Sequence, residues 1–360
     1  MSPTQPIRTT CLQCSRMSSS VSKTSPLRLS GLTYRQFTSS SSSPSGPSSR
    51  SSWLRSHPRL ALTLLGLTLP TSYFFFPSSP SLTPHTYSEQ PISSTQTLSA
   101  QHKLITVPIP ESSTSREFFE RPYRTDGAIA NTEGGEVVVQ HMMIKSPDIQ
   151  IERPYTPIND CLDDGEIRLV VKRVRGGEVG RVVHNLKDGD KVGIRGPIPT
   201  FSIYPNQYDK IIMISTGTAI SPFLQLLSKL PSPSSSSSST SSSEVIPKLH
   251  LIHSNPLEGR EDWSNTIIDK SFLPHLQQKF GNNLQITRID PGLIPKQVIV
   301  NALQHESKSI RDQRVLVLIC LPPMLMRPLC GSMTPNLSQG PITGILGELG
   351  LTNNQVWKLE

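Results

Sequence analysis

The sequence is poor in cysteine, which argues against two kinds of protein. Five cysteines occur in 360 residues, and two of them lie in an N-terminal segment that we expect to be removed. Cys161, Cys320 and Cys330 are too few for a disulfide framework and too scattered for a zinc site. His250 and His253 are three residues apart on a predicted strand, so their side chains should point to opposite faces. We therefore predict no metal site.

Acidic residues are missing from the first 88 positions, where eight Lys or Arg residues occur. Residues 89–360 then hold 27 basic and 27 acidic residues, because 35 minus 8 leaves 27. The formal charge of +8 thus belongs to the N-terminus, and no nucleic-acid partner is expected. An acid-free segment rich in Ser and Arg is typical of a mitochondrial transit peptide, which we predict over residues 1–56. A generic unstructured tail is the alternative.

One apolar run stands out in the N-terminal third of the chain, residues 60–76, and it carries no charge. Its 17 residues reach the lower limit for a membrane-spanning helix, which is about 17. We predict a transmembrane segment here, with a cleaved sorting segment as the alternative. Arginines on its N-terminal side would leave residues 77 onward in the intermembrane space. Residues 77–115 are rich in Ser, Thr and Pro and are predicted to be a disordered linker.

Short strands with glycine turns follow, and they predict an antiparallel β-barrel over residues 117–205. Its strands are expected at residues 137–144, 149–152, 167–173 and 191–195, with helical turns at 180–186. Only 35 positions separate Phe118 from Arg153. That is few for the first strands of such a barrel, so we expect a trimmed barrel or a missing piece.

The pattern changes after Gly196 and Pro197 to apolar strands that alternate with helices. Strands are expected at residues 211–215, 249–252, 284–289 and 315–320. Helices are expected at residues 223–230, between 263 and 280, and near 295–304. This alternation predicts an α/β domain with a parallel sheet over residues 206–360, interrupted by a Ser-rich insertion at 231–243.

Five motifs occur in order along these two regions. They are Arg153-Pro-Tyr-Thr-Pro157, the Lys172 strand with its Gly176-Gly177 turn, Arg195-Gly-Pro197, Gly217-Thr-Ala-Ile-Ser-Pro222 and Cys320-Leu-Pro-Pro-Met324. Together they resemble the ferredoxin-reductase-type FAD-binding flavoproteins, the family that includes cytochrome-b5 reductase. The resemblance implies FAD as the cofactor and NAD(P)H as the electron donor. It identifies no catalytic acid or base.

The resemblance also implies roles for individual residues. Arg153 would pair with the FAD pyrophosphate, for which a planar, multidentate guanidinium is suited. Tyr155 would lie against the flavin, and Thr156 near its reactive edge. The complete implied cofactor set is Arg153, Tyr155, Thr156, Lys172, Gly177, Glu178, Val179, Gly180 and Thr218. Gly180 stands where the family usually has Ser, so one hydroxyl contact to the phosphates is expected to be missing.

The nicotinamide side departs further from the family pattern. Gly217, Cys320 and Pro322 would line it, but Leu321 stands where the family has glycine and would occupy space needed for backbone approach. Ala219 likewise replaces a glycine. The segment 327–331 is not expected to continue a clean helix. Cys320 as an ordinary buried strand residue is the alternative.

The segments 144–157 and 339–359 resemble a fungal mitochondrial subgroup, the cytochrome c import factors. This implies an inner-membrane FAD-dependent oxidoreductase that faces the intermembrane space and passes electrons from NAD(P)H to haem or apocytochrome c. One alternative is a generic cytochrome-b5-type reductase. The other is a flavin-stabilised binding module that holds apocytochrome c or haem lyase, with little catalysis.

Overall fold

The structure is a computed structural model that describes residues 81–146, 150–233, 247–255, 262–304 and 314–359. The predicted transit peptide (1–56), the predicted transmembrane segment (60–76) and most of the Ser-rich insertion lie outside the described residues. Among the described helices, none has both the length and the apolar character needed to cross a membrane.

Three strands lie in the region for which the sequence predicted a linker. They are β1 (Ser88–Pro91), β2 (Ser94–Ser99) and β3 (His102–Pro108). The linker prediction for 77–115 is therefore wrong over these strands, and so is the expectation of a trimmed barrel. Leu104, Ile105 and Val107 of β3 are buried, while Ser and Thr fill most of the more exposed positions of β2. Thr is favoured in strands. A segment rich in Ser and Thr can therefore form strands, although its composition had been interpreted as that of a linker.

The first half of the described chain forms two antiparallel sheets. One has the order β1-β7-β4-β5 and the other β2-β3-β6. The added strands are β4 (Val137–Lys145), β5 (Glu152–Tyr155), β6 (Glu166–Lys172) and β7 (Lys191–Ile203). Strand β1 contacts β3, and β5 contacts β6, so both edge strands of the first sheet contact the second sheet around a shared apolar core. This arrangement confirms the predicted antiparallel barrel.

Some boundaries differ from the predictions. Strand β5 begins at Glu152, although a strand was expected from 149, and 149 lies outside the described residues. Strand β7 continues through Gly196 and Pro197 to Ile203, where the sequence pattern had been taken to change. Three helices accompany the sheets: α3 (Ser113–Glu120), α4 (Cys161–Asp164) and α5 (Glu178–Asn185).

The second half forms a five-stranded parallel sheet of order β10-β9-β8-β11-β12, which confirms the predicted α/β domain. Its strands are β8 (Lys210–Thr216), β9 (Lys248–Ser254), β10 (Leu284–Ile289), β11 (Val315–Cys320) and β12 (Val356–Leu359). Strand β8 is buried along nearly its whole length, as expected for a central parallel strand covered on both faces.

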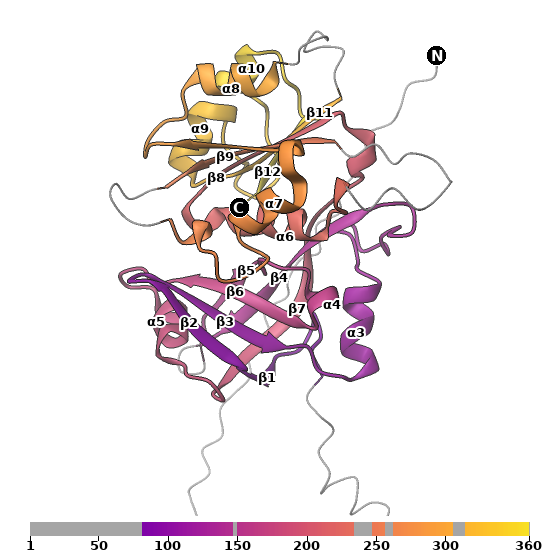
Figure 1. Cartoon of the computed structure of the whole chain (residues 1–360), viewed down its shortest axis with the longest axis vertical. Coiled ribbons are helices and arrows are strands. Elements are labelled where there is room, and N and C mark those ends of the chain that lie inside the picture. The colour runs from indigo at the N-terminus through magenta and orange to yellow at the C-terminus, as the bar shows by residue number, and fades with distance from the viewer. Residues whose placement is uncertain (1–80, 147–149, 234–246, 256–261, 305–313, 360) are drawn as a thin grey trace, which may run out of the picture. The chain divides into compact units, whose positions relative to one another are not determined.

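Helices cover both faces of this sheet (Figure 1). One face packs against α6 (Ser221–Lys229) and α7 (Leu273–Phe280). The other packs against α8 (Lys296–Leu303), α9 (Pro323–Cys330) and α10 (Gly344–Glu348). Helix α9 runs to Cys330 with Pro328 inside it, so the expected break at 327–331 is wrong.

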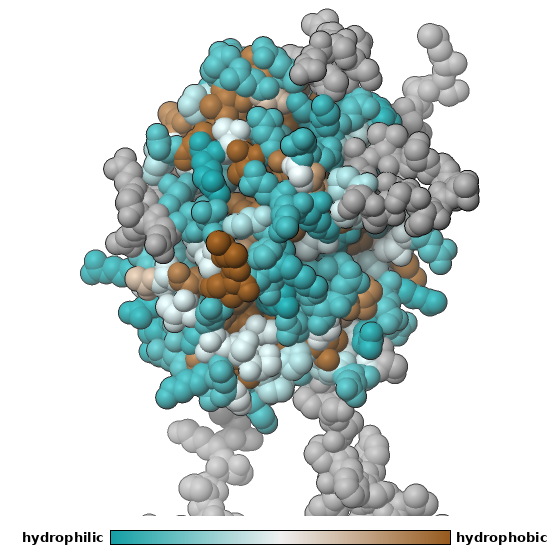
Figure 2. All heavy atoms as spheres, viewed as in Figure 1, coloured by the Kyte–Doolittle hydropathy of each residue, from teal (hydrophilic) through white to brown (hydrophobic). Residues whose placement is uncertain are grey.

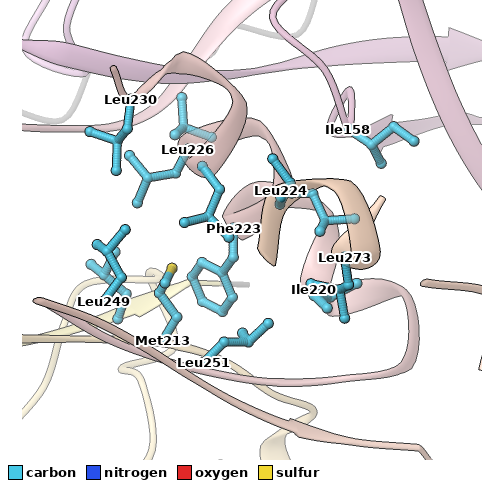
Figure 3. Close-up of a cluster of buried hydrophobic side chains, with 14 of the residues drawn as sticks. Ile158, Met213, Ile220, Phe223, Leu224, Leu226, Leu230, Leu249, Leu251 and Leu273 are labelled. Carbon is cyan, nitrogen blue, oxygen red and sulfur yellow. The ribbon is translucent and has the colours of Figure 1, made fainter. Parts of the chain in front are cut away.

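Helix α6 joins the two halves through an apolar cluster (Figure 3). Phe223 and Leu224 of α6 pack there with Met213 of β8 and with Ile158 of the antiparallel half. Polar contacts reinforce the joint, because the Gln140 backbone N–H donates to Gln225 Oε1 at 2.7 Å. On the face drawn in Figure 2, hydrophilic residues predominate and hydrophobic residues form separate areas. One of the apolar clusters of the described chain therefore spans the two halves.

Candidate functional site

Strand β6 is the element around which the predicted cofactor residues gather. It is contacted by β5, by α5 and by the short 3-10 helix η2 (Gly217–Ile220). Arg153 and Tyr155 belong to β5, Lys172 ends β6, residues 178–180 open α5, and Thr218 lies in η2. Residues up to 65 positions apart in sequence are thus brought to one strand.

The Arg153 guanidinium is exposed and has no carboxylate partner among the described residues. Its one hydrogen bond there runs from Nη1 to the carbonyl oxygen of Glu152, at 2.9 Å. Tyr155 is half-buried beside the barrel core, and burial raises the pKa of its phenol, an effect that Arg153 opposes. Thr156 follows directly and is also half-buried. Arg153 is therefore available to bind an anion.

Arg195, the arginine of the third motif, is engaged inside the protein. Its Nη1 donates to the carbonyl oxygen of Pro84 at 2.9 Å, and its Nη2 lies 3.4 Å from Glu152 Oε2. Its guanidinium also lies over the Tyr87 ring, 5.3 Å from the ring centre. Arg195 therefore connects β7 to the segment before β1. The sequence alone did not show that this arginine is bound within the protein.

The glycine turn before α5 presents backbone N–H groups. Gly176 has a φ of +76°, which favours glycine, and Gly177 is the N-cap without any side-chain cap. The first backbone N–H groups of α5 therefore have no side-chain acceptor, and the helix dipole favours an anion there. Glu178 is half-buried and pairs with Arg181 on the helix. Val179 is buried in the barrel core.

Gly180 is a glycine because α5 lies very close to β6. A Cβ at this position would be 2.8 Å from the carbonyl oxygen of Lys172, which is closer than side chains approach backbone. A Ser at this position would therefore not fit without a shift of the helix. The close packing of α5 on β6 is therefore the reason that this position has no Ser hydroxyl to contact the phosphates.

The η2 turn follows β8 at the carboxyl edge of the parallel sheet. Gly217 is buried with a φ of +54°, Thr218 and Ala219 are half-buried, and the Ser221 hydroxyl donates to the Thr218 carbonyl at 3.0 Å. The carboxyl edge of such a sheet is where α/β folds bind ligands. Of the residues predicted for the nicotinamide side, Gly217 thus lies at the expected edge.

Cys320 ends β11 at the same edge, and its neighbour Leu321 does not occupy the site. Leu321 is buried in the apolar cluster beneath α8, α9 and α10, on the opposite face from the α6 cluster that Cys320 packs against. The expectation that its side chain fills the space needed for backbone approach is therefore wrong. Burial raises the pKa of the Cys320 thiol to about 12, and Pro322 is the exposed N-cap of α9.

Sequence reasoning missed a buried polar chain at this edge, formed by Ser215, His253 and Asp262. The Ser215 hydroxyl lies 2.9 Å from His253 Nδ1, and His253 Nε2 lies 3.6 Å from Asp262 Oδ2. His250 makes a separate bond, from Nε2 to the Thr287 hydroxyl at 2.8 Å. Opposite faces had been expected for the two histidines, but no sequence signal identified their partners. Among the described residues, no group of three His, Cys, Asp or Glu could hold a metal ion.

The polar groups of the first half fit FAD. Within the described residues they comprise a guanidinium without a carboxylate partner, an uncapped helix N-terminus after a glycine turn, and a half-buried tyrosine, all on elements that contact β6. A diphosphate needs these donors, and the ring system of a flavin suits the aromatic neighbour.

Comparison with known proteins agrees with this fit. The family described as "Oxidoreductase FAD-binding domain" matches residues 130–203. NADH-cytochrome b5 reductase 2 of Meyerozyma guilliermondii is 33% identical over 216 residues, covering 57% of this chain and 67% of that protein. The protein of the same name from Candida glabrata is 29% identical over 251 residues, covering 68% and 78%. The chain thus spans about two thirds of the first relative's length.

A solved structure shares the fold. The cytochrome b5 reductase domain of Ulva prolifera nitrate reductase matches with a TM-score of 0.50 and 17% identity, covering 78% of this chain and all of that domain. The matched barrel sequence, the relatives and the shared fold agree with the site geometry. The chain therefore belongs to the ferredoxin-reductase-type family of FAD-dependent NAD(P)H oxidoreductases that is related to NADH-cytochrome b5 reductase.

Proposed function

We propose that this protein is an NAD(P)H reductase that uses FAD to deliver electrons to a haem protein of the cytochrome b5 type. The observation that carries the proposal is that Arg153, which has no carboxylate partner among the described residues, the uncapped N-terminus of α5 and Thr218 all lie on elements that contact β6. The acceptor is suggested by the relatives named NADH-cytochrome b5 reductase 2.

The flavin half supplies binding and orientation. Arg153 and the N–H groups at residues 178–180 would hold the pyrophosphate, and Lys172 and Thr218 would border the cofactor from β6 and η2. Tyr155 and Thr156 would lie beside the ring, where burial keeps the tyrosine phenol protonated. Bound FAD would accept a hydride from the nicotinamide and release its electrons singly. The residues of this chain position that exchange.

The nicotinamide would approach the carboxyl edge of the parallel sheet between η2 and the start of α9. Gly217, Cys320 and Pro322 would border it there. Because the Cys320 thiol has a pKa raised by burial, it would act as a neutral surface and not as a thiolate. The buried position of Leu321 supports room for the nucleotide at this edge.

The test is an anaerobic titration of the FAD-loaded full chain with NADH and with NADPH, followed by cytochrome b5. We expect rapid bleaching of the flavin absorbance and reduction of the cytochrome. A flavin that dithionite bleaches and neither nucleotide does would overturn the reductase proposal. It would favour the flavin-stabilised binding module for apocytochrome c or haem lyase.

The cytochrome c reading is a second candidate, favoured by the acid-free N-terminal 88 residues and by the segment 339–359. Here the chain would sit in the mitochondrial inner membrane and reduce haem destined for apocytochrome c. Submitochondrial fractionation tests the location. Parallel rate measurements with ferric haem plus apocytochrome c and with cytochrome b5 test the acceptor, and faster reduction of cytochrome b5 would count against this candidate.

A further inference from the structure

A cavity of about 200 Å³ lies at the end of the parallel sheet opposite to the nicotinamide edge. Strands β8, β9 and β10 are parallel, and the cavity is lined by the first residues of β8 and β9 and by the second residue of β10. Helix α8 contributes Gln304, the residue that follows its last turn. Seven of the eight lining residues are polar, and none is Asp or Glu. The function proposed above makes no use of this cavity.

The register of the sheet brings three basic side chains to one face at this edge. Lys210 of β8 is in register with Lys248 of β9, and His250 follows two positions after Lys248. Residues in register on parallel neighbours, and residues two apart on a strand, project from the same face of a sheet. Ile212, which is in register with His250, packs in the apolar cluster beneath α8, α9 and α10. The three side chains therefore lie on the α8 face of the sheet.

Lys210 binds the end of α8 and keeps one donor in reserve. The residue is 9% exposed, and its Nζ donates to the carbonyl oxygen of Ala302 at 2.8 Å and to that of Gln304 at 3.1 Å. An ammonium group has three donors, so one N–H of Lys210 is left for another acceptor. Carbonyl dipoles at a helix C-terminus offset only part of a full positive charge.

The Lys248 ammonium lacks an ion-pair partner within the described part of the chain. Asp209, which precedes Lys210, does not line the cavity and pairs with Arg314 at 2.9 Å. Burial first and then Lys248 lower the pKa of Lys210. The two cations thus repel each other, which is unfavourable for the charged form of each. An anion bound in the cavity would offset that repulsion.

Neutral side chains make up the rest of the lining. His250 is 4% exposed, its Nε2 lies 2.8 Å from the Thr287 hydroxyl, and its Nδ1 has no hydrogen-bond partner among the described residues. Burial first and then Lys210 lower the pKa of His250 to about 4, so its imidazole is neutral at pH 7. The side chains of Asn282 and Gln285 are exposed at the cavity and offer amide donors.

We propose that this cavity binds a small oxyanion of the phosphate class, at a site separate from those for the flavin and the nicotinamide. Lys248 and the remaining N–H of Lys210 would donate charge-assisted hydrogen bonds to the anion, and the exposed amides would donate to its outer oxygens. Pockets for drug-sized ligands begin at roughly 300 Å³, so this one holds a phosphate group and not a dinucleotide. The two sources of such a group are free inorganic phosphate and a phosphomonoester whose remaining part lies outside the cavity. The inference does not depend on the proposed function.

Calorimetric titration of the FAD-loaded full chain with inorganic phosphate tests the site, with the ionic strength held constant by potassium chloride. We expect saturable binding to the wild type. Lys248→Met should weaken binding about fivefold, the worth of one partly exposed ion pair, and Lys248→Glu should abolish it. The matched control is Lys187→Met, which removes an exposed lysine outside the cavity and should bind phosphate like the wild type.

Glycerol 3-phosphate separates the two sources, because it carries a phosphate on a small body without a nucleotide base. If it binds at least as tightly as inorganic phosphate, and Lys248→Glu abolishes the binding of both, the site accepts a phosphomonoester. If only inorganic phosphate binds, and Lys248→Glu abolishes that binding, the ligand is the free anion.

NMR of the FAD-loaded full chain with 15N-labelled histidine locates the bound anion. The ring resonances of His250 should move on addition of phosphate, with the midpoint that calorimetry gives. Those of His141, on β4, should stay in place. Lys248→Glu should abolish the movement of the His250 resonances.

Three results would overturn the inference: no saturable phosphate binding, equal phosphate affinity in the wild type and Lys248→Glu, or an equal loss of phosphate affinity in Arg153→Ala and Lys248→Glu. The last result would place the anion at the flavin site. Flavin bleaching by NADH should be the same in the wild type and Lys248→Glu. A chain that binds phosphate as expected, but whose flavin neither NADH nor NADPH bleaches, would keep this inference and overturn the proposed function.

Discussion

The two halves of the site differ in whether their polar groups are exposed or hydrogen-bonded within the protein. On the flavin side, Arg153 is exposed and has no carboxylate partner within the described part of the chain, and α5 begins without a side-chain cap. On the nicotinamide side, polar groups are closed on one another: Ser215 with His253, Thr216 with the Ser254 carbonyl, and the Ser254 hydroxyl with the Asp290 carbonyl. The flavin side thus presents donors to solvent, while on the nicotinamide side several buried hydroxyls are already bonded within the protein.

This difference indicates how each half recognises its ligand. A diphosphate carries charge that exposed donors can neutralise, so the flavin side should lose affinity when a single donor is removed. A nicotinamide ring is neutral in its reduced form and is held largely by shape. The nicotinamide side should therefore respond to changes in backbone position more than to loss of one charge.

The largest effect is expected where the two halves are locked together, at Arg168 of β6. Arg168 Nη1 lies 3.1 Å from Asp164 and 2.7 Å from Asp269, which precedes α7. The Asp164 side chain is 4% exposed, so Arg168→Met removes one cation from a buried charge and leaves it Lys270 and the Asn159 side-chain amide. We expect a loss of about 3 kcal/mol in the free energy of unfolding, measured by urea denaturation.

Arg116→Met is the matched control, because Arg116 and Glu120 form an exposed pair at 3.7 Å. Such a pair contributes about 0.5 kcal/mol or less. If the two variants lost the same free energy of unfolding, the Arg168 ion pairs would stabilise the protein no more than an exposed pair does. The two halves would then not be held together by Arg168.

The next effect concerns the open donor on the flavin side. Arg153→Ala should weaken FAD binding about tenfold to a hundredfold, since a hydrogen bond to a charged group contributes about 1.5–3 kcal/mol. Fluorescence titration of the apoprotein with FAD measures the change. Arg116→Ala should bind FAD like the wild type, and an Arg153→Ala affinity in the same range would remove Arg153 from the flavin site.

A third change separates packing from phosphate contact. Gly180→Ser introduces the family's usual hydroxyl but sets its Cβ 2.8 Å from the Lys172 carbonyl oxygen. We expect a destabilisation of about 1–3 kcal/mol from overpacking, read from the thermal or urea transition. Gly177→Ala should cost less, because its closest contact would be Cγ2 of Val174, a side chain of a residue that is 51% exposed, and the nearest backbone atom would be farther away, at 3.3 Å. Unchanged stability in Gly180→Ser would show that α5 can move away from β6.

The last measurement concerns Cys320, whose thiol is buried on the nicotinamide side, and involves no change to the sequence. Its thiol pKa is raised from 9.0 to about 12, so the thiolate forms only at pH values well above 9. Native alkylation by iodoacetamide at pH 8 should be roughly a hundredfold to a thousandfold slower than in urea, as judged by site-resolved mass spectrometry. Fast native alkylation would place this thiol in an open, charged environment like that of Arg153.

Several elements of the fold were predictable from local pattern. The uninterrupted apolar run of β8 and its glycine turn predicted a central parallel strand at a ligand-binding edge, and the structure agrees. Strand β3 was not predicted, because its apolar residues are few and lie between Ser- and Thr-rich segments. Pairing with β6 is what makes it a strand, and pairing is not visible in a single sequence.

For the site, too, some features could be predicted from local sequence and others depended on the tertiary structure. The motifs at 153–157 and 176–180 resemble those of the ferredoxin-reductase-type flavoproteins, and that resemblance implied FAD before the structure was described. The sequence could not show that Leu321 is buried on the opposite face from Cys320, nor that Gly180 is enforced by the Lys172 carbonyl. Both depend on which face a side chain takes and on how closely two elements approach.

By itself, then, the sequence determined the class of chemistry and the order of the two domains, since motifs and hydrophobic periodicity are local properties. Only the tertiary structure decided which polar groups are free and which are paired. Arg153 and Arg195 look alike in the sequence, yet one is exposed and the other is held by Pro84 and Glu152. Pairing depends on distances between segments far apart in the chain, and packing alone sets those distances.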